Sequence, residues 1–260
     1  MITYNLLDKQ NEIAHFCTSR EGGVSVGNYA SLNLSPFTGD EESCFAENKK
    51  LLCDKLRIDS DDLIIPFQTH GSEIREIDKA FFELSTEERQ QYLNGVDAVI
   101  TRLTGICVGV TTADCVPMLF FDPTKQVVAA VHAGWRGTCA GIAGKTVSFM
   151  IEKYHSNPAD ILVTIGPSIS ADVYEVGEEV VAEFQAAGFE ISEIVEMRDN
   201  SIFLNLWNAN QQLLERNGVL PNHIEISGIC TYTEHERFFS ARRLGIKSGR
   251  LLSGIMLRVG

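Results

Sequence analysis

The sequence predicts a mixed-sheet fold of the α/β or α+β class. Three β-type runs follow one another in the middle of the chain, at Gly105–Thr112, Val116–Asp122 and Gln126–His132. These runs are apolar without clean alternation, which is typical of strands covered on both faces. Helical segments follow them, and they mix with further strands without strict alternation. That mixture favours a mixed sheet over a regular βαβ repeat.

The turn Asp122-Pro123-Thr124-Lys125 separates the second run from the third and predicts a β-hairpin. After the hairpin, Ile142, Val147, Met150 and Ile151 can share one apolar helix face. Later apolar runs bounded by turn residues predict the remaining elements. In chain order we expect a helix over Gly137–Tyr154, a strand over Ile161–Ile165, a helix over Gly177–Ala187, a strand over Ile202–Leu206, a helix over Trp207–Asn217, and strands over Ile224–Ile229 and Leu251–Leu257.

Length and composition predict a folded protein with a sizeable core. The chain has 260 residues, of which 44% are hydrophobic and 22% are charged. This balance is that of ordinary globular proteins. No internal repeat, low-complexity tract or linker interrupts the sequence, so we expect one domain over residues 1–260.

The charge of the chain is strongly negative and restricts its partners. With 22 Lys and Arg against 35 Asp and Glu, the formal net charge is −13. Such a protein repels nucleic-acid phosphates and anionic lipids, so we expect neither nucleic acid nor membrane as a partner. A substrate that carries or uses phosphate would need a local basic pocket. The sequence does not indicate the oligomeric state.

The cysteines and the N-terminus indicate a reducing compartment. There are seven cysteines, widely spaced and without a C-x-x-C pair, which argues against a disulfide framework and against a zinc ribbon. The first residues lack a basic segment followed by an apolar run, so we expect no signal peptide. Together these features predict a cytoplasmic protein.

Reactive side chains gather in three short segments at the ends of expected strands. The segments are Gln68–Gly71, Thr112–Cys115 and His132–Gly137. Loops at strand ends are where such folds collect functional groups, because rigid strands fix the loop bases. These segments are therefore the candidate site.

Cys115 and His132 flank the predicted hairpin, and the outer ends of an antiparallel hairpin are neighbours. The two side chains are therefore expected to lie close together. Such a pair can be a thiolate–imidazole dyad for covalent catalysis. With His70 it can instead be a Cys-His-His site of the catalytic zinc type. A third interpretation is a buried core thiol beside histidines bound to the backbone. Spacing alone leaves these alternatives open and does not place His70.

The motifs QTHG, TTADCVPMLFFD, AAVHAGWRGT, IGPSIS, YEVGEEV and FFSARR resemble the YfiH-like family. That family is described as polyphenol oxidoreductase (laccase) proteins and as purine nucleoside phosphorylases. The resemblance runs from about Arg20 to the C-terminus. It implies a four-layer α/β/β/α arrangement with mixed β-sheets, and a catalytic Zn²⁺ held by His70, Cys115 and His132.

The resemblance also implies the substrates. They are purine nucleosides and inorganic phosphate, with phosphorolysis of adenosine, inosine, guanosine and methylthioadenosine. Hydrolytic deamination of adenosine is a further implied activity. Some family members are instead linked to the editing of cell-wall precursors.

Phosphorolysis needs an anion site, and arginines are its candidates. We expect Arg243 to hold phosphate, together with Arg20 or Arg136, and Arg242 is a further candidate. The turn over Gly134–Gly137 opens a helix whose free N–H groups favour anions. A surface position is the alternative for Arg136.

Further substrate contacts are expected from Asn48 and Cys230, with Asn33 as another ribose-pocket candidate. Asp114, beside the candidate thiolate, could orient a ligand histidine or accept a proton. Each of these has a structural alternative: an Asx turn for Asn33, a helix surface for Asn48, a core thiol for Cys230 and a turn cap for Asp114.

Three other functions compete with the nucleoside-cleaving one. A Cys-plus-two-His site can hold copper, as in a polyphenol oxidase (laccase), yet the chain has only six histidines and no H-x-H pair. A cysteine-dependent amidase or deamidase of peptidoglycan precursors would use Cys115 as nucleophile and His132 as base. A binding module without catalysis would bind a metal and a ligand but turn nothing over.

Overall fold

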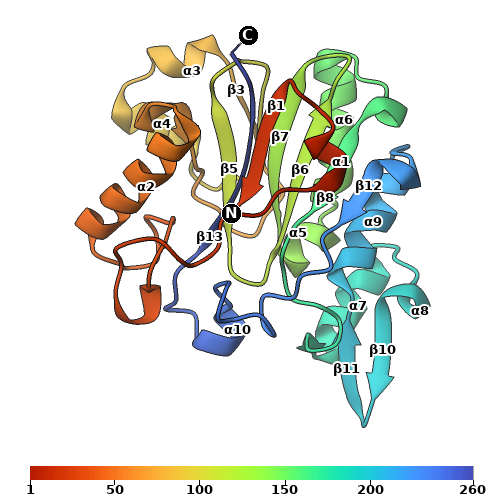
Figure 1. Cartoon of the computed structure of the whole chain (residues 1–260). Helices are drawn as coiled ribbons and strands as arrows, with labels where there is room; N and C mark the ends of the chain where they lie inside the picture. The colour runs from red at the N-terminus through yellow and green to blue at the C-terminus, as the bar shows by residue number, and fades with distance from the viewer. Residues whose placement is uncertain (260) are drawn as a thin grey trace.

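Two β-sheets form the centre of the molecule (Figure 1). In the computed structural model, which describes residues 1–259, a six-stranded sheet has the order β12-β8-β6-β7-β4-β3 and a four-stranded sheet the order β1-β13-β5-β2. Each sheet contains parallel and antiparallel pairs, so the predicted mixed-sheet class is confirmed. The strands are β1 (Ile13–Cys17), β2 (Leu63–Ile64), β3 (Ile74–Ile77), β4 (Ala98–Thr101), β5 (Cys107–Thr112), β6 (Val116–Asp122), β7 (Val127–Ala133), β8 (Leu162–Ile165), β12 (Ile224–Ile226) and β13 (Leu251–Leu257).

The sheets lie face to face because their central strands are apolar on both sides. Along β6, Leu119 and Phe121 join the core shared with the four-stranded sheet, whereas Met118 and Phe120 join the core on the opposite face. Successive side chains of a strand point to opposite faces, so a strand buried on both faces carries an unbroken apolar run. This arrangement explains the lack of alternation in the sequence.

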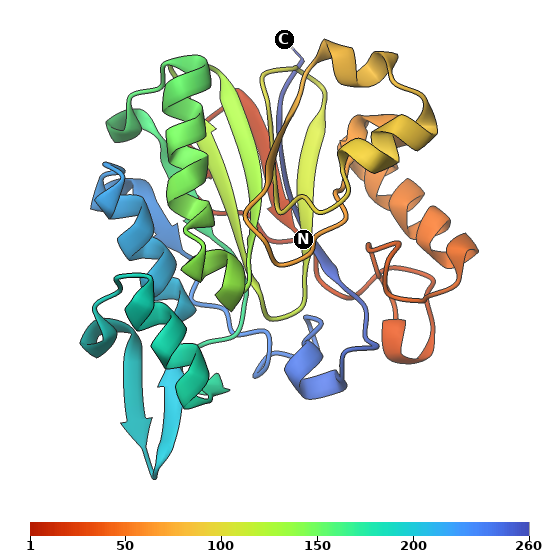
Figure 2. The same cartoon turned by 180° about the vertical axis from the view of Figure 1, so that it is seen from behind.

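Helices cover the outer faces of the two sheets (Figure 2). Helices α6 (Ile142–Tyr154) and α9 (Leu206–Arg216) pack on the six-stranded sheet, and α2 (Glu42–Leu56) packs on the four-stranded sheet. Within residues 1–259, none of the helices combines the length and apolarity that a bilayer crossing requires. The remaining helices are α1 (Asn5–Asp8), α3 (Lys79–Glu83), α4 (Thr86–Tyr92), α5 (Trp135–Cys139), α7 (Glu178–Ala186), α8 (Ile191–Ile194) and α10 (Ala241–Leu244).

The helix expected over Gly137–Tyr154 is two helices, α5 and α6. Gly141 lies between them with a φ of 76°, in the left-handed region that glycine adopts without steric cost. The apolar periodicity predicts the helix from residue 142 onward, whereas the residues before Gly141 belong to a separate short helix. The break follows the glycine-rich segment after β7.

A small third sheet projects from the body, in the order β10-β11-β9 (Figure 1). Its strands are β9 (Glu175–Val176), β10 (Val195–Arg198) and β11 (Ser201–Leu204). The sequence predicts the second strand of this hairpin within a few residues, but β10 carries no period-2 apolar signal and was not expected. Two consecutive left-handed residues, Asp199 and Asn200, form the turn.

Candidate metal centre and substrate cavity

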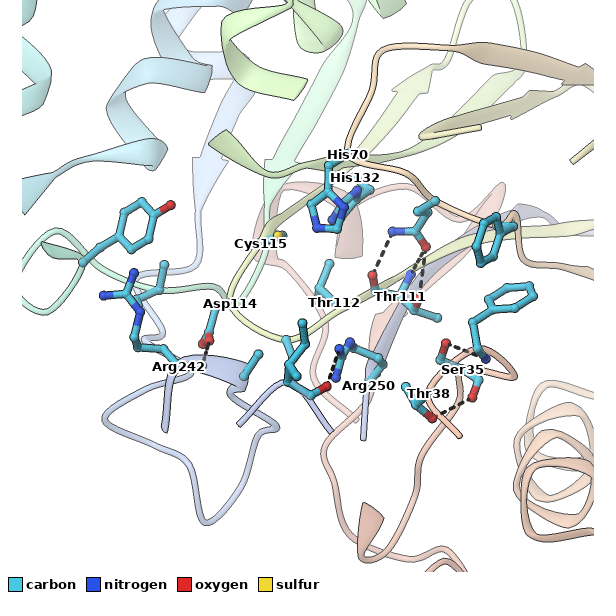
Figure 3. Close-up of a pocket in the computed structure, with 18 residues that line it drawn as sticks. Ser35, Thr38, His70, Thr111, Thr112, Asp114, Cys115, His132, Arg242 and Arg250 are labelled. Atoms are coloured by element: carbon cyan, nitrogen blue, oxygen red, sulfur yellow. Dashed lines mark hydrogen bonds between the residues drawn. The ribbon is translucent and has the colours of Figure 1, made fainter. Parts of the chain in front are cut away.

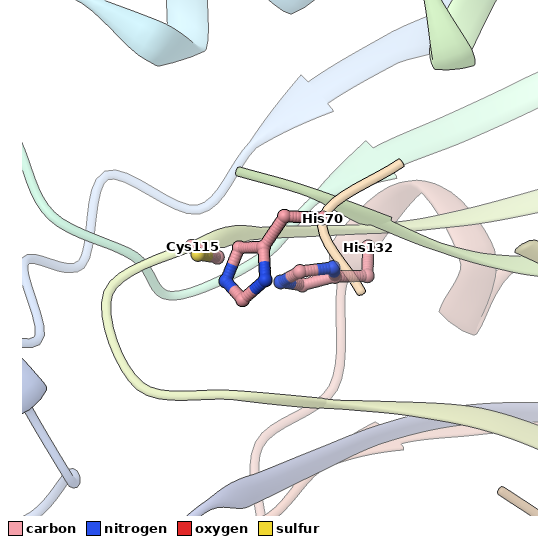
Figure 4. Close-up of side chains that lie close together, drawn as sticks. All are labelled: His70, Cys115 and His132. Carbon is pink, nitrogen blue, oxygen red and sulfur yellow. The ribbon is translucent and has the colours of Figure 1, made fainter. Parts of the chain in front are cut away.

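The β6–β7 hairpin brings Cys115 and His132 together. The strands are antiparallel, with Val116 opposite Ala133 and Pro117 opposite His132, and Cys115 directly precedes β6. The predicted proximity of these two side chains is therefore confirmed. His70 joins them from another loop, and the ligand atoms of the three residues all lie within 4.8 Å of one another (Figure 4).

His70 reaches the hairpin because its loop is tied to the end of β5. The Gln68 amide donates to the Thr111 carbonyl oxygen at 2.9 Å, and its oxygen accepts from the Thr111 N–H at 2.8 Å. The backbone of His70 is left-handed, with a φ of 62°. These constraints place the imidazole beside Cys115. The spacing between residues 70 and 115 in the sequence does not predict this proximity.

A buried carboxylate, Asp97, holds both histidines. Its Oδ1 lies 2.7 Å from Nδ1 of His132 and accepts from the backbone N–H of His70 at 3.0 Å. Its Oδ2 accepts from the N–H of Gly71 at 2.7 Å. A hydrogen bond from Nδ1 of His132 leaves Nε2 free to bind a metal. Sequence reasoning missed Asp97, although an acidic residue inside the otherwise apolar run Val96–Ile100 was a usable signal.

Charges within the cluster favour a thiolate. Burial opposes ionisation of Cys115, but the charge of His132, with hydrogen bonds from His132 and His70, lowers the pKa of the thiol to about 6. Burial likewise opposes the imidazolium of His132, but Cys115 and Asp97 raise the pKa of that ring to about 9. The metal-free site therefore holds a thiolate–imidazolium pair at neutral pH. A thiolate is the form of cysteine that binds metals.

Gly134 makes the cluster compact. A Cβ at this position would lie 2.9 Å from Cδ2 of His70 and 3.2 Å from Sγ of Cys115. Only a residue without a side chain lets the backbone pass so close to both groups. On the opposite side the cluster opens into a cavity, which His70, Cys115 and His132 help to line.

The cavity below the cluster has a volume of about 580 Å³ and extends to both sides of it (Figure 3). Arg242 and Asp114 lie on one side, and Ser35, Thr38 and Thr111 lie on the other. We call these sides the arginine arm and the aromatic arm. The arginine arm also contains Ile169, Tyr174 and Ala241, the aromatic arm also contains Phe37, Phe67 and Gln68, and Thr112, Ala113, Ile246 and Arg250 complete the lining.

Two arginines line this cavity, Arg242 and Arg250. Arg242 stacks on Tyr174, with its guanidinium carbon 5.1 Å from the ring centroid. Arg250 donates to the carbonyl oxygens of Ser248, Gly249 and Ile246. The sequence predicts Arg242 as a candidate but gives no signal for Arg250, which belongs to no motif and directly precedes the last strand.

The other arginines expected at the site lie elsewhere. Arg20 stacks on Phe239 and donates to the carbonyl oxygens of Ala30 and His235. Arg243 points to the hydroxyl of Tyr232, at 3.4 Å. Neither belongs to the lining of the main cavity within residues 1–259.

Arg136 has an intermediate place. It stacks on Trp135 at 4.2 Å and lines a smaller adjoining cavity of about 170 Å³, which shares His70 and Cys115 with the main one. The five-residue helix α5 begins beside it at Trp135. Arg136, which the sequence predicts as a phosphate ligand, therefore lies near the cluster but lines the neighbouring cavity.

Asn48 and Cys230 occupy structural positions. The Asn48 amide donates to Ser25, to Ser31 and to the carbonyl oxygen of Asn33, and its oxygen accepts from the N–H of Val24, so its polar atoms are used within the protein. Cys230 is buried and its sulfur accepts from the N–H of Ser170. Both residues lie outside the lining formed by residues 1–259.

Asn33 and Asp114 hold the backbone of segments that border the cavity. The side-chain oxygen of Asn33 accepts from the backbone N–H of Arg250 at 2.9 Å. Asp114 accepts from the backbone N–H of Arg242 at 2.6 Å and from the Thr231 hydroxyl at 2.7 Å. These bonds fix the segments that carry the two lining arginines. The carboxylate that orients a histidine is Asp97 rather than Asp114.

A sequence profile described as multi-copper polyphenol oxidoreductase laccase matches residues 14–258. The chain belongs to this family. A crystal structure of the YfiH protein of Bacillus licheniformis, 32% identical, superposes with a TM-score of 0.90 over 96% of this chain and 95% of that one. The resemblance to the YfiH-like family that the motifs indicated is therefore confirmed.

Relatives in the family carry the names of nucleoside enzymes. The chain is 44% identical, over 99% of its length and 96% of the relative, to a protein of Bacteroides thetaiotaomicron named purine nucleoside phosphorylase. It is 41% identical, over 92% of both chains, to adenosine deaminase RL5 from an unknown prokaryotic organism. These relatives support an enzyme that acts on purine nucleosides.

Replacing Asp97 with Asn tests whether this carboxylate prepares the metal site. We expect Asp97→Asn to bind Zn²⁺ about 10–100-fold more weakly than the parent protein, because a neutral amide no longer holds the His132 N–H with a full charge. Competition with a chromophoric chelator measures the affinity. Asp122→Asn is the control, since Asp122 is also fully buried but caps the turn after β6. Equal affinities in both variants would contradict the role of Asp97.

The lowered pKa of Cys115 predicts its reactivity in metal-free protein. A depressed pKa means that the thiolate forms as the pH rises through about 6, so alkylation by iodoacetamide should accelerate over that range and then level off. Cys17 and Cys139, whose pKa values are raised to about 11 by burial, should stay slow. Cys115→Ser should lose the fast phase, and added Zn²⁺ should suppress it. A rate that keeps rising up to pH 9 would refute the assignment.

Proposed function

We propose that the chain is a zinc-dependent purine nucleoside phosphorylase that cleaves adenosine, inosine, guanosine and methylthioadenosine and also deaminates adenosine. The observation that carries the proposal is the His70–Cys115–His132 cluster, which opens into a cavity lined by arginines. The names of the relatives give the substrate class. The chemistry of the cavity supports it as follows.

The donor set fits zinc. Two imidazoles and one thiolate leave one position open, which is the pattern of catalytic rather than structural zinc. His70, Cys115 and His132 would hold the ion, and Asp97 would orient His132 from behind. When bound, zinc supplies Lewis-acid chemistry and lowers the pKa of a bound water.

Phosphate has a binding place in this acidic protein at Arg242 and Arg250. Both guanidinium groups line the cavity, and carbonyl oxygens or an aromatic ring fix each of them. Arginine binds phosphate through planar, charge-assisted hydrogen bonds. We assign these two residues to phosphate in place of Arg20 and Arg243, with Arg136 contributing positive charge from the adjoining cavity.

The proposed reaction is a substitution at C1′ of the ribose. A phosphate oxygen forms a bond to C1′ while the bond from C1′ to N9 of the base breaks, and the base leaves with the electron pair and takes up a proton. The products are ribose 1-phosphate and the free purine. Arg242 and Arg250 would hold the phosphate dianion at the correct distance, which removes much of the entropic cost of bringing two reactants together.

Deamination is the second activity, and the adenosine deaminase relative favours it. Water replaces the 6-amino group of adenine, ammonia leaves, and the glycosidic bond stays intact. This reaction needs no phosphate. Residues that hold phosphate are therefore dispensable for deamination, whereas the metal ligands are needed for both reactions.

Two other interpretations of the cluster are weaker. A multi-copper oxidase requires several copper sites, and within residues 1–259 the cluster His70–Cys115–His132 is the one group of three or more His, Cys, Asp and Glu side chains that could hold a metal. The thiolate–imidazolium pair of Cys115 and His132 favours a cysteine-dependent amidase or deamidase of peptidoglycan precursors as the alternative. That enzyme would be insensitive to chelators and would form an acyl-enzyme.

Product analysis with adenosine tests the proposal directly. We expect zinc-loaded protein to give adenine and ribose 1-phosphate with phosphate present, and inosine without it. Cys115→Ala, His70→Ala and His132→Ala should each lose the bound zinc and both activities. Chromatography of the products and metal analysis of each variant measure the outcome. Full phosphorolysis by Cys115→Ala would overturn the proposal.

A pair of adjacent arginines tests the phosphate site. Arg242→Met should raise the KM for phosphate about tenfold or more, the usual loss for a hydrogen bond to a charged group, and should leave deamination of adenosine in phosphate-free buffer nearly unchanged. Arg243→Met is the matched control, because Arg243 lies next along α10 but points to Tyr232. Equal effects of the two substitutions would contradict the assignment of Arg242.

A further inference from the structure

The aromatic arm contains two large apolar side chains that the protein leaves half uncovered. Phe37 is 50% exposed and Phe67 is 40% exposed, yet both line the catalytic cavity. Their rings pack edge to face, with centroids 4.7 Å apart. Both rings also border an outer groove, and exposed aromatic surface lacks the stabilisation of burial until something covers it.

Both rings stand on backbone that is firmly held. The N–H of Phe67 donates to the Leu93 carbonyl oxygen, and the Phe67 carbonyl oxygen accepts from the N–H groups of Gly95 and Val96. The Phe37 N–H donates to the Ser35 hydroxyl. A rigid aromatic surface binds a flat ligand without the entropic cost of ordering the loop.

The loop that carries Phe37 is fixed by a second set of bonds. The Asn33 amide donates to the hydroxyl of Thr38 at 3.0 Å and to the carboxylate of Asp40 at 3.0 Å. Asn33 also accepts from the backbone of Arg250, so the same side chain holds the aromatic loop and a lining arginine. The spacing between the two arms is therefore built into the structure.

The two arms differ in charge. The aromatic arm is lined by Ser35, Phe37, Thr38, Phe67, Gln68 and Thr111, all of which are neutral. The opposite arm contains Arg242 and Asp114, the metal cluster lies between the arms, and Arg250 lies below the cluster, on the side of Thr38 (Figure 3). A purine is a neutral, flat π-system that stacks on aromatic rings, whereas phosphate requires arginine.

Three polar side chains of the aromatic arm, Thr38, Gln68 and Thr111, already form hydrogen bonds within the protein. The Gln68 oxygen accepts from both the backbone N–H and the hydroxyl of Thr111, and its amide donates to the Thr111 carbonyl oxygen. The Thr38 hydroxyl donates to the Ser35 carbonyl oxygen. With these groups used within the protein, a base in this arm is recognised by its faces rather than by the hydrogen-bonding pattern of its edge.

We propose that Phe37 and Phe67 form the subsite for the purine base, and that stacking there selects purine over pyrimidine nucleosides with little discrimination among adenosine, inosine and guanosine. This inference rests on the proposed function. It accounts for one cavity serving purines that differ in their exocyclic groups, because stacking depends on ring area and tolerates different edges.

Kinetics of alanine variants test the subsite. Phe37→Ala and Phe67→Ala should each raise the KM for adenosine, inosine and guanosine by a similar factor, about tenfold or more, as expected when a stacking partner of a base is removed. The KM for phosphate should stay within about twofold of its parent value, since phosphate binds through the charge of arginines rather than through the aromatic rings. Phe37→Trp should restore a low KM for the nucleosides.

Phe45→Ala is the matched control. Phe45 is half-buried and lines a wider outer groove that also contacts Phe37 and Phe67, but it does not line the catalytic cavity within residues 1–259. Its removal should leave the nucleoside KM unchanged. An equal rise in Phe45→Ala, or a KM that changes for adenosine alone, would overturn the proposed subsite.

Calorimetric binding of inosine without phosphate separates failure of the subsite from failure of the function. Inosine is already deaminated and is not cleaved without phosphate, so binding is measured without turnover. Weaker binding to both alanine variants, with no turnover by the parent protein, would refute the phosphorylase and support the subsite. Turnover by the parent protein with unchanged binding and KM in the variants would refute the subsite alone.

Discussion

One fully buried carboxylate, Asp97, organises the candidate centre. It accepts hydrogen bonds from the backbone of the loop that carries His70 and contacts the imidazole of His132. Burial of a charge without partners is strongly unfavourable, so the loop N–H groups and the imidazole are the groups that make this carboxylate tolerable in the core. The same bonds bring two histidines from distant parts of the chain to one point.

The sequence predicted what depends on local strand geometry. Cys115 and His132 were expected to be neighbours because an antiparallel hairpin joins them, and the register of β6 and β7 confirms this. The place of His70 depends on the Gln68–Thr111 tie and on Asp97, which are contacts between distant residues. Local sequence patterns do not predict contacts between distant residues, and only the family motifs indicated His70 as a ligand.

The sequence did not predict which arginines line the cavity. Arg243 and Arg242 are adjacent on a helix of four residues, where neighbours point in different directions; the sequence favoured Arg243 for the site, whereas the structure places Arg242 in the cavity lining. Arg250 reaches the cavity through the long-range bond from its backbone to Asn33. Tertiary contacts of this kind set the direction of side chains at the ends of helices and strands. At these end positions the structure differs from the sequence-based expectation.

The three candidate ligands come from three separate loops, and an ion shared by them would act as a clasp between segments that are far apart in the chain. A disulfide stabilises mainly by constraining the unfolded chain, whereas such an ion would stabilise the protein by binding the folded state, and it can be released by acid or by a chelator. Resistance to heat and to proteases would then rise and fall with the supply of metal. The hairpin end of the six-stranded sheet would be the part of the fold most sensitive to that supply.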